Sequence, residues 1–333
     1  MARMKHDTTH ITILGAGVIG TALGNILAAK PGLEVTLLSI EPDTVDEIRR
    51  SHMNSRCFPT LRLHDNLRAT LDNQVLENAG LVFLAIPSVV VVDYLESLRP
   101  FLCPESLLVN LAKGFGCGNK TVCQCLSERL PNPVSTLKGP SFAREIINRI
   151  PTAFTLGYSE ETHRNQVANV LADTSIYLDY STDVTGVEIL SILKNMYAIV
   201  MGVIDAQFNS PNLRFMVLTK AFREMRRVLV HYGGREDTLF LYCGYGDFTL
   251  TSLNDLSRNR TLGLLIGKGF FTEHVSHELV LEGKTAVGIF YQELSGKINV
   301  DAEFPIIAEL HRLFTTRYDL SAFVKHIIHG AEP

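Results

Sequence analysis

The chain has 333 residues, which corresponds to about two domains at roughly 150 residues each. Hydrophobic residues make up 46% of it and charged residues 20%, so ordinary globular cores are expected and a disordered chain is excluded. Lys and Arg number 31 against 35 Asp and Glu, and the net charge of −4 without a long basic run argues against nucleic acid as the main partner.

The N-terminal segment and the cysteines favour a cytoplasmic protein. Residues 1–10 are polar, and the strand that follows is too short for the core of a signal peptide. The longest apolar stretch, Leu81 to Val92, is interrupted by Pro87 and falls short of the ~20 residues that span a bilayer, so no stable membrane insertion is expected. The six cysteines show neither a framework of pairs nor a CxxC spacing, and we expect reduced thiols.

Strand and helix patterns alternate through the first half of the chain. A β-branched run, Ile11 to Leu14, is followed by the glycine turn Gly15 to Gly20, by a helical rhythm to Leu27 and by a second strand at Glu34 to Leu38. This order is the βαβ unit of dinucleotide-binding domains. Apolar and β-branched runs predict further strands at Leu81–Ile86, Leu107–Leu111, Thr152–Leu156 and Ser175–Leu178.

The pattern changes near residue 182. Val184 to Ile204 is apolar almost all round, which predicts a buried helix. Further helices are predicted at Phe215–Tyr232, Leu262–Gly267 and Glu303–Thr315, and no strong strand alternation follows. We therefore expect an α/β dinucleotide-binding (Rossmann-like) domain over residues 1–182 and an all-α substrate and catalytic domain over residues 183–333.

The glycine turn carries the first chemical signal. Gly15 permits the tight turn, Gly17 lets the backbone approach a pyrophosphate, and Gly20 lets the helix pack close to the sheet. The GxGxxG pattern lies between a strand and a helix, and this context favours a dinucleotide site over a tight turn in some other α/β protein.

The residues after the second strand bear on the choice of cofactor. Ser39 stands where an Asp or Glu would hold the ribose hydroxyls of NAD, Glu41 lies two residues on, and no Lys or Arg precedes Arg49. We expect NAD or NADP, with a slight preference for NAD.

Two lysines and one polar segment are the other candidate groups. Lys194 interrupts the apolar helix, where a lysine is either used for acid–base work or reaches solvent from one helix face. Lys113 follows a buried strand, where open α/β sheets place ligands, or is a solvated surface lysine. Residues 244–260 combine a carboxylate, hydroxyls and arginines that suit a phosphate, or form a polar loop with a helix cap. No histidine or cysteine spacing implies a metal.

In combination these motifs resemble the soluble, bacterial-type NAD(P)-dependent glycerol-3-phosphate dehydrogenase family. The resemblance covers nearly the whole chain in order, and it includes Asn54–Pro59, Lys113-Gly114, Gly139–Glu145, Leu193–Asn195, Gly246-Asp247 and Ser257–Arg260. It implies reversible interconversion of dihydroxyacetone phosphate and sn-glycerol 3-phosphate, a place in glycerophospholipid metabolism, and a homodimer.

The resemblance also implies roles for individual residues. Lys194 would donate and accept the proton, and the remaining catalytic positions are Lys113, Asp247, Asn195 and Thr251. The implied substrate positions are Lys113, Gly139, Ser141, Lys194, Asp247, Ser257, Arg258 and Asn259. The cofactor positions, which join Gly15, Gly17 and Gly20 of the glycine turn, are Val18, Ile19, Lys113, Ala143, Arg258, Val280 and Glu282.

Some positions depart from the family pattern. Leu190-Ser191 replaces a glycine pair, residues 206–211 replace a glycine-rich stretch, Phe215 stands where a small residue is usual, and Ile19 stands where an aromatic residue is usual. Bulkier side chains after the Lys194 helix would reshape a substrate pocket. Two alternatives therefore stay open: a related dehydrogenase of a different polyol phosphate or keto acid, and a non-catalytic nucleotide-binding sensor.

Overall fold

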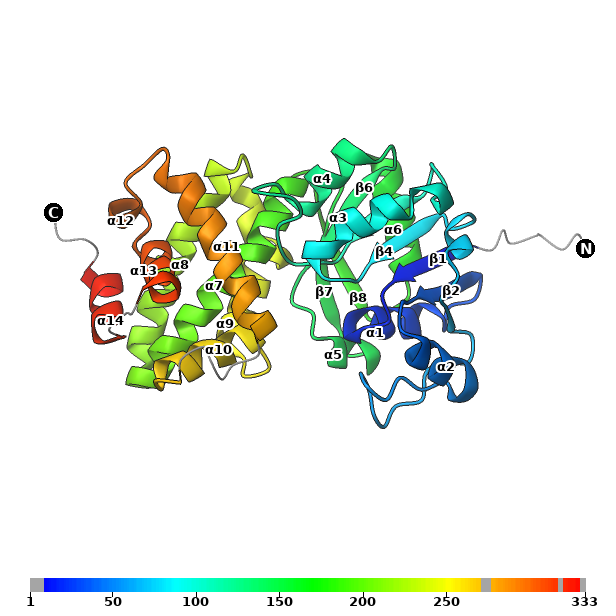
Figure 1. The fold of residues 1–333 in the computed structure, drawn as a ribbon, viewed down its shortest axis with the longest axis horizontal. Coiled ribbons are helices and arrows are strands. Elements are labelled where there is room, and N and C mark those ends of the chain that lie inside the picture. The colour runs from blue at the N-terminus through cyan, green and yellow to red at the C-terminus, as the bar shows by residue number, and fades with distance from the viewer. Residues whose placement is uncertain (1–8, 271–276, 317–319, 330–333) are drawn as a thin grey trace, which may run out of the picture. The chain divides into compact units, whose positions relative to one another are not determined.

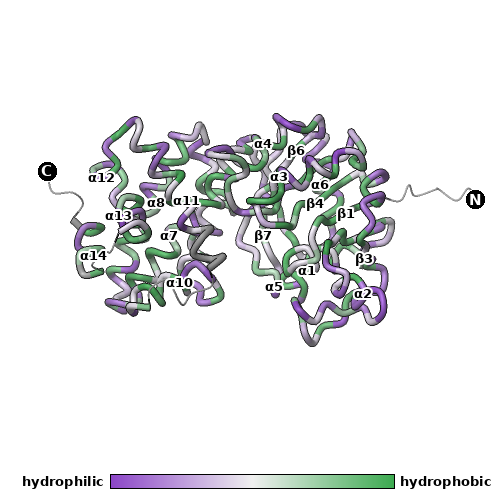
Figure 2. The backbone as a smooth tube through the Cα atoms, viewed as in Figure 1, coloured by the Kyte–Doolittle hydropathy of each residue, from purple (hydrophilic) through white to green (hydrophobic). Residues whose placement is uncertain are grey.

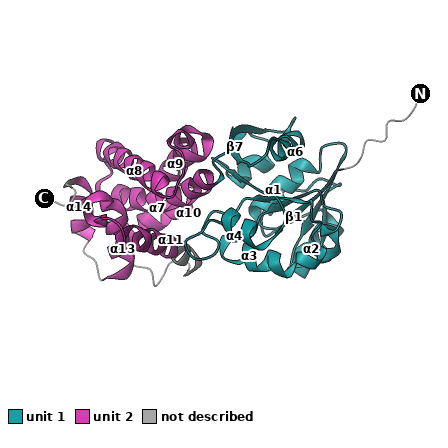
Figure 3. Cartoon of the chain, turned by 90° about the horizontal axis from the view of Figure 1, so that it is seen from above, with its two compact units in different colours: residues 1–184 teal, residues 185–333 magenta. Residues whose placement is uncertain are grey.

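The computed structural model describes the backbone of residues 9–270, 277–316 and 320–329. The chain divides into two compact units, residues 1–184 and 185–333 (Figure 3). Unit 1 contains a mostly parallel sheet with helices, and unit 2 is helical. This confirms the predicted fold class, and the division falls two residues after the boundary expected from the sequence.

Unit 1 is built on one eight-stranded sheet (Figure 1). The strand order is β3-β2-β1-β4-β5-β6-β7-β8, and every neighbouring pair is parallel except β6 and β7. The strands are β1 (Thr9–Leu14), β2 (Leu33–Leu38), β3 (Arg68–Thr70), β4 (Leu81–Leu84), β5 (Leu107–Asn110), β6 (Val134–Lys138), β7 (Thr152–Gly157) and β8 (Ile176–Ser181). The helices are α1 (Val18–Leu27), α2 (Pro42–Ser51), α3 (Ser88–Ser97), α4 (Val122–Arg129), α5 (Ala143–Ile147) and α6 (Glu161–Leu171), with 3₁₀ turns η1 (Asn73–Leu76) and η2 (Arg99–Phe101).

The sheet of unit 1 is buried on both faces. Leu81 and Phe83 of β4 belong to one hydrophobic cluster, and Val82 and Leu84 belong to a second cluster. Since side chains alternate between the faces of a strand, the unbroken apolar run of β4 fills both clusters at once. The strand order reverses between β1 and β4, and in such sheets ligands bind outside the carboxyl ends of the strands at this switch point.

Unit 2 consists of helices. They are α7 (Val184–Phe208), α8 (Pro211–His231), α9 (Asp247–Leu253), α10 (Arg258–Gly267), α11 (His277–Ser295), α12 (Val300–Glu303), α13 (Pro305–Thr315) and α14 (Leu320–His329). A 3₁₀ turn η3 (Glu236–Phe240) and a π-helical turn η4 (Tyr242–Gly246) precede α9. The helices predicted at α7, α8, α10 and α13 are present, whereas α9, α11, α12 and α14 were not predicted.

Helix α7 has the length and composition of a membrane span, with a mean hydropathy of 1.7 over its most apolar 18 residues. In the structure 94% of that window is buried inside the protein. Figure 2 shows the hydropathy of each described residue along the backbone. The apolar pattern is therefore that of a helix in the protein core. Met196 and Tyr197 on this helix are fully buried.

One expectation about the cysteines is wrong. The structure pairs Cys117 with Cys125 in a disulfide, with the two Cα atoms 6.2 Å apart. Cys117 lies in the loop after β5, and Cys125 lies on α4. The fold brings these two residues together, and their spacing in the sequence did not predict the disulfide. Cys57, Cys103, Cys123 and Cys243 are not part of this disulfide.

A buried glutamate joins three helices of unit 2. The Glu224 carboxylate on α8 accepts hydrogen bonds from the backbone N–H groups of Ile306 (2.8 Å) and Ile307 (3.3 Å) in the first turn of α13. It also accepts one from the Tyr197 hydroxyl on α7, at 3.2 Å. Burial raises the pKa of Glu224 from its ordinary 4.5 to about 8.

The raised pKa of Glu224 makes unit 2 less stable in alkali. Between pH 4.5 and 8 the folded protein binds a proton that the unfolded chain has lost, so the free energy of unfolding falls as pH rises through this window. We expect the free energy of unfolding of the wild type to fall by up to about 1.4 kcal/mol per pH unit in this window. The Glu224→Gln variant should not show this fall, because its side chain does not titrate. Urea unfolding of both proteins at pH 5, 6.5 and 8 measures it. Parallel pH curves would contradict the assignment.

Candidate functional site

The glycine turn lies at the switch point of the unit 1 sheet. Gly15 has a φ of +108°, and a Cβ there would lie 2.7 Å from the carbonyl oxygen of Ala85, which follows β4. Both observations require glycine. Gly17 is different, because a Cβ there would meet no heavy atom of the described residues within 4 Å. The fold therefore leaves an open approach to the backbone at Gly17, where α1 begins.

Gly20 lies where α1 meets the glycine turn and the end of β4, and a Cβ there would lie 3.2 Å from the Ala85 Cβ, in agreement with close packing of the helix. A Cβ on Gly20 would overlap the carbonyl oxygen of Gly15, so this glycine closes the turn on itself. Gly24 also lets α1 pack closely on the strands. A Cβ added at Gly24 would lie 2.9 Å from the Leu37 side chain on β2 and 3.3 Å from the Ile13 side chain on β1.

Exposed apolar side chains surround the carboxyl ends of the central strands. Val18 at the start of α1, Ile40 just after β2 and Val89 near the start of α3 are all exposed. Ile19, the next residue on α1, is half-buried against the core. An apolar rim of this kind suits a flat aromatic ring. Ile40 and Val89 were not predicted as site residues, although they follow the ends of β2 and β4 by two and five residues, in the region where ligands bind.

The loop after α2 is attached to the glycine turn. Asn54 is buried, and its amide nitrogen donates to the Ala16 carbonyl oxygen and to the Thr21 hydroxyl, both at 2.9 Å. The next residues of the loop reach back to α2. This arrangement makes the segment beginning at Asn54 part of the same site as the glycine turn.

A basic residue lies beside Glu41, contrary to the expectation from the local sequence. Glu41 precedes α2, and its carboxylate accepts hydrogen bonds from Thr44 (3.0 Å) and from the Arg56 guanidinium. These bonds hold the pKa of Glu41 below its ordinary value. Ser39 is buried, and its hydroxyl accepts the backbone N–H of Glu41. The absence of Lys and Arg before Arg49 therefore did not exclude a cation at this strand end.

Further predicted residues of unit 1 lie at the ends of β5 and β6. Lys113 is half-buried and follows β5 by three residues. Lys138, which the sequence analysis did not single out, is fully buried, and its ammonium group donates to the carbonyl oxygens of Asn110 (3.1 Å) and Ala112. It thus ties β6 to the residues that precede Lys113.

Gly139, Ser141 and Ala143 follow in the turn after β6. A Cβ on Gly139 would lie 2.7 Å from the Phe154 Cα on β7, so glycine is required where the chain leaves β6 beside the neighbouring strand β7. The Ser141 hydroxyl donates to the Gly139 carbonyl oxygen at 2.9 Å. Ala143 is the first residue of α5 and packs against the core.

Unit 2 holds a buried ion pair. Lys194 on α7 is 2% exposed, and its ammonium group pairs with the Asp247 carboxylate, which is also buried. Asp247 is the first residue of α9, directly after the π-helical turn η4. The Thr251 hydroxyl, one turn further, donates to Asp247 at 3.4 Å. Asn195, next to the lysine, is half-buried. The structure therefore brings Lys194, Asp247 and Thr251 into one cluster.

The predicted phosphate segment splits into two groups at the start of α10. Arg258 is exposed and Asn259 half-buried, and both occupy the first turn of the helix. Ser257 is the N-cap and accepts the backbone N–H of Arg260 at 3.3 Å. Arg260 is buried and its guanidinium pairs with Asp205 and Asp255, each at 2.7 Å. The Arg258 side chain is thus open to solvent, whereas that of Arg260 is held by two ion pairs.

Glycines bring α7 and α10 into backbone contact. A Cβ on Gly202 of α7 would overlap the Arg260 carbonyl oxygen, and one on Gly263 of α10 would overlap the Ile199 carbonyl oxygen. Asp205, eleven residues after Lys194, lies about three helical turns along the same face of α7. One face of α7 therefore positions both Asp247 and the start of α10. Asp205 was not predicted as a site residue, although its spacing of about three turns from Lys194 places the two residues on one face of the helix.

Most departures from the family pattern lie on α7, on α8 and in the turn between them. Residues 206–211 form the last turn of α7 and the start of α8, where Asn209 has a φ of +37° and Ser210 caps α8. Phe208 and Phe215 are exposed, and Leu190 is fully buried. Val280 and Glu282 fall within α11, but their side chains lie outside the described residues.

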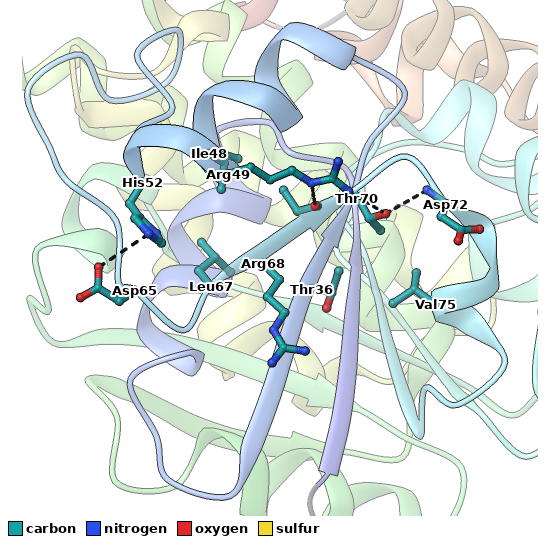
Figure 4. Close-up of a pocket in the computed structure, with 11 residues that line it drawn as sticks. Thr36, Ile48, Arg49, His52, Asp65, Leu67, Arg68, Thr70, Asp72 and Val75 are labelled. Carbon is teal, nitrogen blue, oxygen red and sulfur yellow. Dashed lines mark hydrogen bonds and ion pairs between the residues drawn. The ribbon is translucent and has the colours of Figure 1, made fainter.

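A cavity of about 510 Å³ lies elsewhere in unit 1, between α2 and the edge of the sheet (Figure 4). In its lining, Arg49 donates to the carbonyl oxygen of Ala69 at 2.9 Å, and the His52 ring lies 3.9 Å from the Asp65 carboxylate. None of the residues predicted from the sequence lines it. Within the described ranges, no group of three or more His, Cys, Asp or Glu side chains is placed to bind a metal ion.

Comparisons with known proteins agree with this geometry. The family model for the N-terminus of NAD-dependent glycerol-3-phosphate dehydrogenase matches residues 10–164, and the model for its C-terminus matches residues 183–325. A relative from Methanothermobacter thermautotrophicus, named glycerol-3-phosphate dehydrogenase (NAD(P)+), is 39% identical over 263 residues, which are 78% of this chain and 80% of the relative. A relative of the same name from Geobacter sp. (strain M21) is 34% identical over 91% of this chain and 92% of its own length.

A solved structure gives the same result. The crystal structure of glycerol-3-phosphate dehydrogenase from Coxiella burnetii matches with a TM-score of 0.87 at 27% identity, and the match covers 97% of this chain and 99% of that one. Together with the two family models, these matches span nearly the whole chain. The chain belongs to the NAD-dependent glycerol-3-phosphate dehydrogenase family.

Proposed function

We propose that the protein is an NAD(P)-dependent oxidoreductase that interconverts dihydroxyacetone phosphate and sn-glycerol 3-phosphate. The relatives that match most of its length carry the name of this activity. The observation that carries the proposal is the buried pair of Lys194 and Asp247 in unit 2. A lysine held in an apolar core beside one carboxylate is a group that can give up and recover a proton without bulk water.

Residues of unit 1 fit a dinucleotide. The open backbone at Gly17 and the N-terminus of α1 would hold the pyrophosphate, because unpaired N–H groups there attract an anion. Val18, Ile40 and Val89 would line the adenine, and Ser39 and Glu41 would meet its ribose. When bound, the nicotinamide supplies the hydride that reduces the C2 carbonyl of the substrate.

Lys194 provides the proton in this proposal. In reduction its ammonium group donates to the carbonyl oxygen as negative charge develops there, and in oxidation the neutral amine takes the proton back. Asp247 orients Lys194 and balances its charge, and Thr251 holds Asp247 through its hydroxyl. Because the pair is buried, its electrostatic effect is stronger than it would be in water.

The first turn of α10 would bind the substrate phosphate. Arg258 contributes a guanidinium that forms charge-assisted hydrogen bonds with phosphate oxygens, and Asn259 adds an amide donor. Ser257 keeps the helix start ordered by capping it. A phosphate fixed there would anchor the reacting carbon. We assign Lys113, Gly139 and Ser141 to the substrate and Ala143 to the cofactor on the basis of the family resemblance.

The finer features of the proposal rest on composition and on the resemblance. We propose a modest preference for NADH over NADPH, a homodimer, a cytoplasmic location and a contribution to glycerophospholipid synthesis. The retained Lys194, Asp247 and Arg258 favour an enzyme over a nucleotide-binding sensor, because a sensor does not need a proton donor.

Initial rates of NADH and NADPH oxidation with dihydroxyacetone phosphate test the function. We expect turnover with both cofactors, and a kcat/KM at least about 100-fold higher than with unphosphorylated dihydroxyacetone, since a charge-assisted phosphate contact is lost in that control. Neighbouring sugar phosphates test the altered segment 206–211. Higher kcat/KM with one of these than with dihydroxyacetone phosphate would replace the proposed substrate.

A pair of glycine variants tests the cofactor site. Gly17→Ala should leave the free energy of unfolding within about 1 kcal/mol of wild type, because its φ of −75° suits alanine and the space is open. It should weaken NADH binding at least about tenfold, since the methyl group fills the approach to the pyrophosphate. Gly20→Ala should instead destabilise the fold by about 1–3 kcal/mol through overlap with Gly15.

Urea unfolding and NADH titration of both variants provide the two readouts. Wild-type NADH affinity in Gly17→Ala would show that the dinucleotide does not approach this turn. The Gly20→Ala variant serves as the matched control, because it changes the same turn by the same methyl group.

A further inference from the structure

The loop that carries Arg56 is fixed at three successive residues. Asn54 is anchored on the glycine turn, and its carbonyl oxygen accepts the backbone N–H groups of Cys57 (3.0 Å) and Phe58 (2.8 Å) in a tight turn. The Ser55 backbone N–H donates to the Glu47 carboxylate of α2 at 3.0 Å. Arg56 then pairs with Glu41. The backbone of Arg56 is thus held in place by bonds to the glycine turn and to α2.

The side chain of Arg56 is accessible although its backbone is fixed. It is 73% exposed, and Glu41 is 44% exposed, so both charged groups can meet a ligand from solvent. Glu41 stands two residues after Ser39 at the carboxyl end of β2, the place where dinucleotide-binding sheets meet the adenosine ribose. A carboxylate there binds ribose hydroxyls, and an arginine nearby binds a 2′-phosphate.

We propose that Arg56 is the residue that admits the 2′-phosphate of NADP, and that the Arg56–Glu41 pair lets one site accept both nicotinamide cofactors. This inference rests on the proposed function. With NAD, Glu41 accepts the ribose hydroxyls while Arg56 stays paired to it. With NADP, the guanidinium turns to the phosphate oxygens and separates them from the Glu41 carboxylate, which would otherwise repel them. The anchored loop supplies both arrangements without moving its backbone.

Replacing Arg56 tests cofactor choice without disturbing the fold. An exposed ion pair contributes little to stability, so Arg56→Ala should unfold like the wild type. Arg50→Ala is a matched control, because Arg50 is an exposed arginine on the adjacent helix α2 with its own carboxylate partner, Asp46, at 3.5 Å. Both variants lose one positive charge from the same surface region, and only one loses it at the ribose end of the proposed site.

Titrations of NADH and NADPH into the purified protein, followed by calorimetry, measure binding without turnover. We expect Arg56→Ala to weaken NADPH binding by about tenfold or more and NADH binding by less than about threefold, because the lost contact is to the 2′-phosphate alone. Glu41→Gln should strengthen NADPH binding and weaken NADH binding, so it should shift the cofactor preference in the direction opposite to Arg56→Ala. Arg50→Ala should leave the ratio of the two affinities unchanged.

Two results separate the inference from the function beneath it. If the wild type binds both cofactors but Arg56→Ala leaves NADPH affinity unchanged or weakens NADH and NADPH equally, Arg56 has no role in cofactor choice and the proposed function stands. If the wild type binds neither nicotinamide, the proposed function fails and this inference fails with it.

Discussion

The burial of the ion pair between Lys194 and Asp247 is the physical constraint that the other contacts of unit 2 have to satisfy. Both side chains are almost completely removed from solvent, and removing two charges from water costs several kcal/mol for each ion. A pair of well-packed apolar residues would fill the same space at less cost. The surrounding structure therefore sustains a charged group where packing alone would favour a neutral one, and this is the condition that acid–base chemistry requires.

The rest of unit 2 can be understood as support for that pair. Helix α7 presents Lys194 and, about three turns later, Asp205 on one face. Phe248, next to Asp247, packs edge-on against Tyr197 of α7 with ring centroids 6.3 Å apart, which fixes the start of α9. Gly202 and Gly263 let α10 approach α7 closely, and Arg260 locks that approach through Asp205. The exposed Arg258 is then presented from a rigid helix start.

Much of this fold could be predicted from local pattern. The run at β4 is apolar at every position, and the run at β5 is apolar except at the buried Asn110, because both faces of those strands are buried. Helix α7 is apolar almost all round for the same reason. By contrast β6 was missed, because Thr136 and Lys138 read as exposed residues. Both are buried, and their polar atoms are bonded to main-chain oxygens of the neighbouring strand and its loop. Strand β3 has three residues, too few to show a period.

A candidate group could be predicted where one residue type stands out from its surroundings, as for Lys194 in an apolar helix, and the structure shows that this lysine is buried. Its catalytic role stays a proposal. It was not predictable where a contact joins distant segments. Arg56 meets Glu41 through a loop anchored on the glycine turn, and nothing local to either residue reports that contact. Arg258 and Arg260 are neighbours in sequence, but residues two apart point to different sides of a helix, so one is exposed and the other is buried.

The central claim is that Lys194 and Asp247 are present for chemistry and not for stability. Urea unfolding of the double variant Lys194→Met/Asp247→Leu, together with its turnover of dihydroxyacetone phosphate, tests it most directly. The account predicts a free energy of unfolding equal to or above that of wild type, since apolar replacement of a buried pair is neutral or stabilising by about 1–4 kcal/mol, and turnover reduced at least about 100-fold. A double variant that unfolds several kcal/mol more easily, or that retains wild-type turnover, would contradict it.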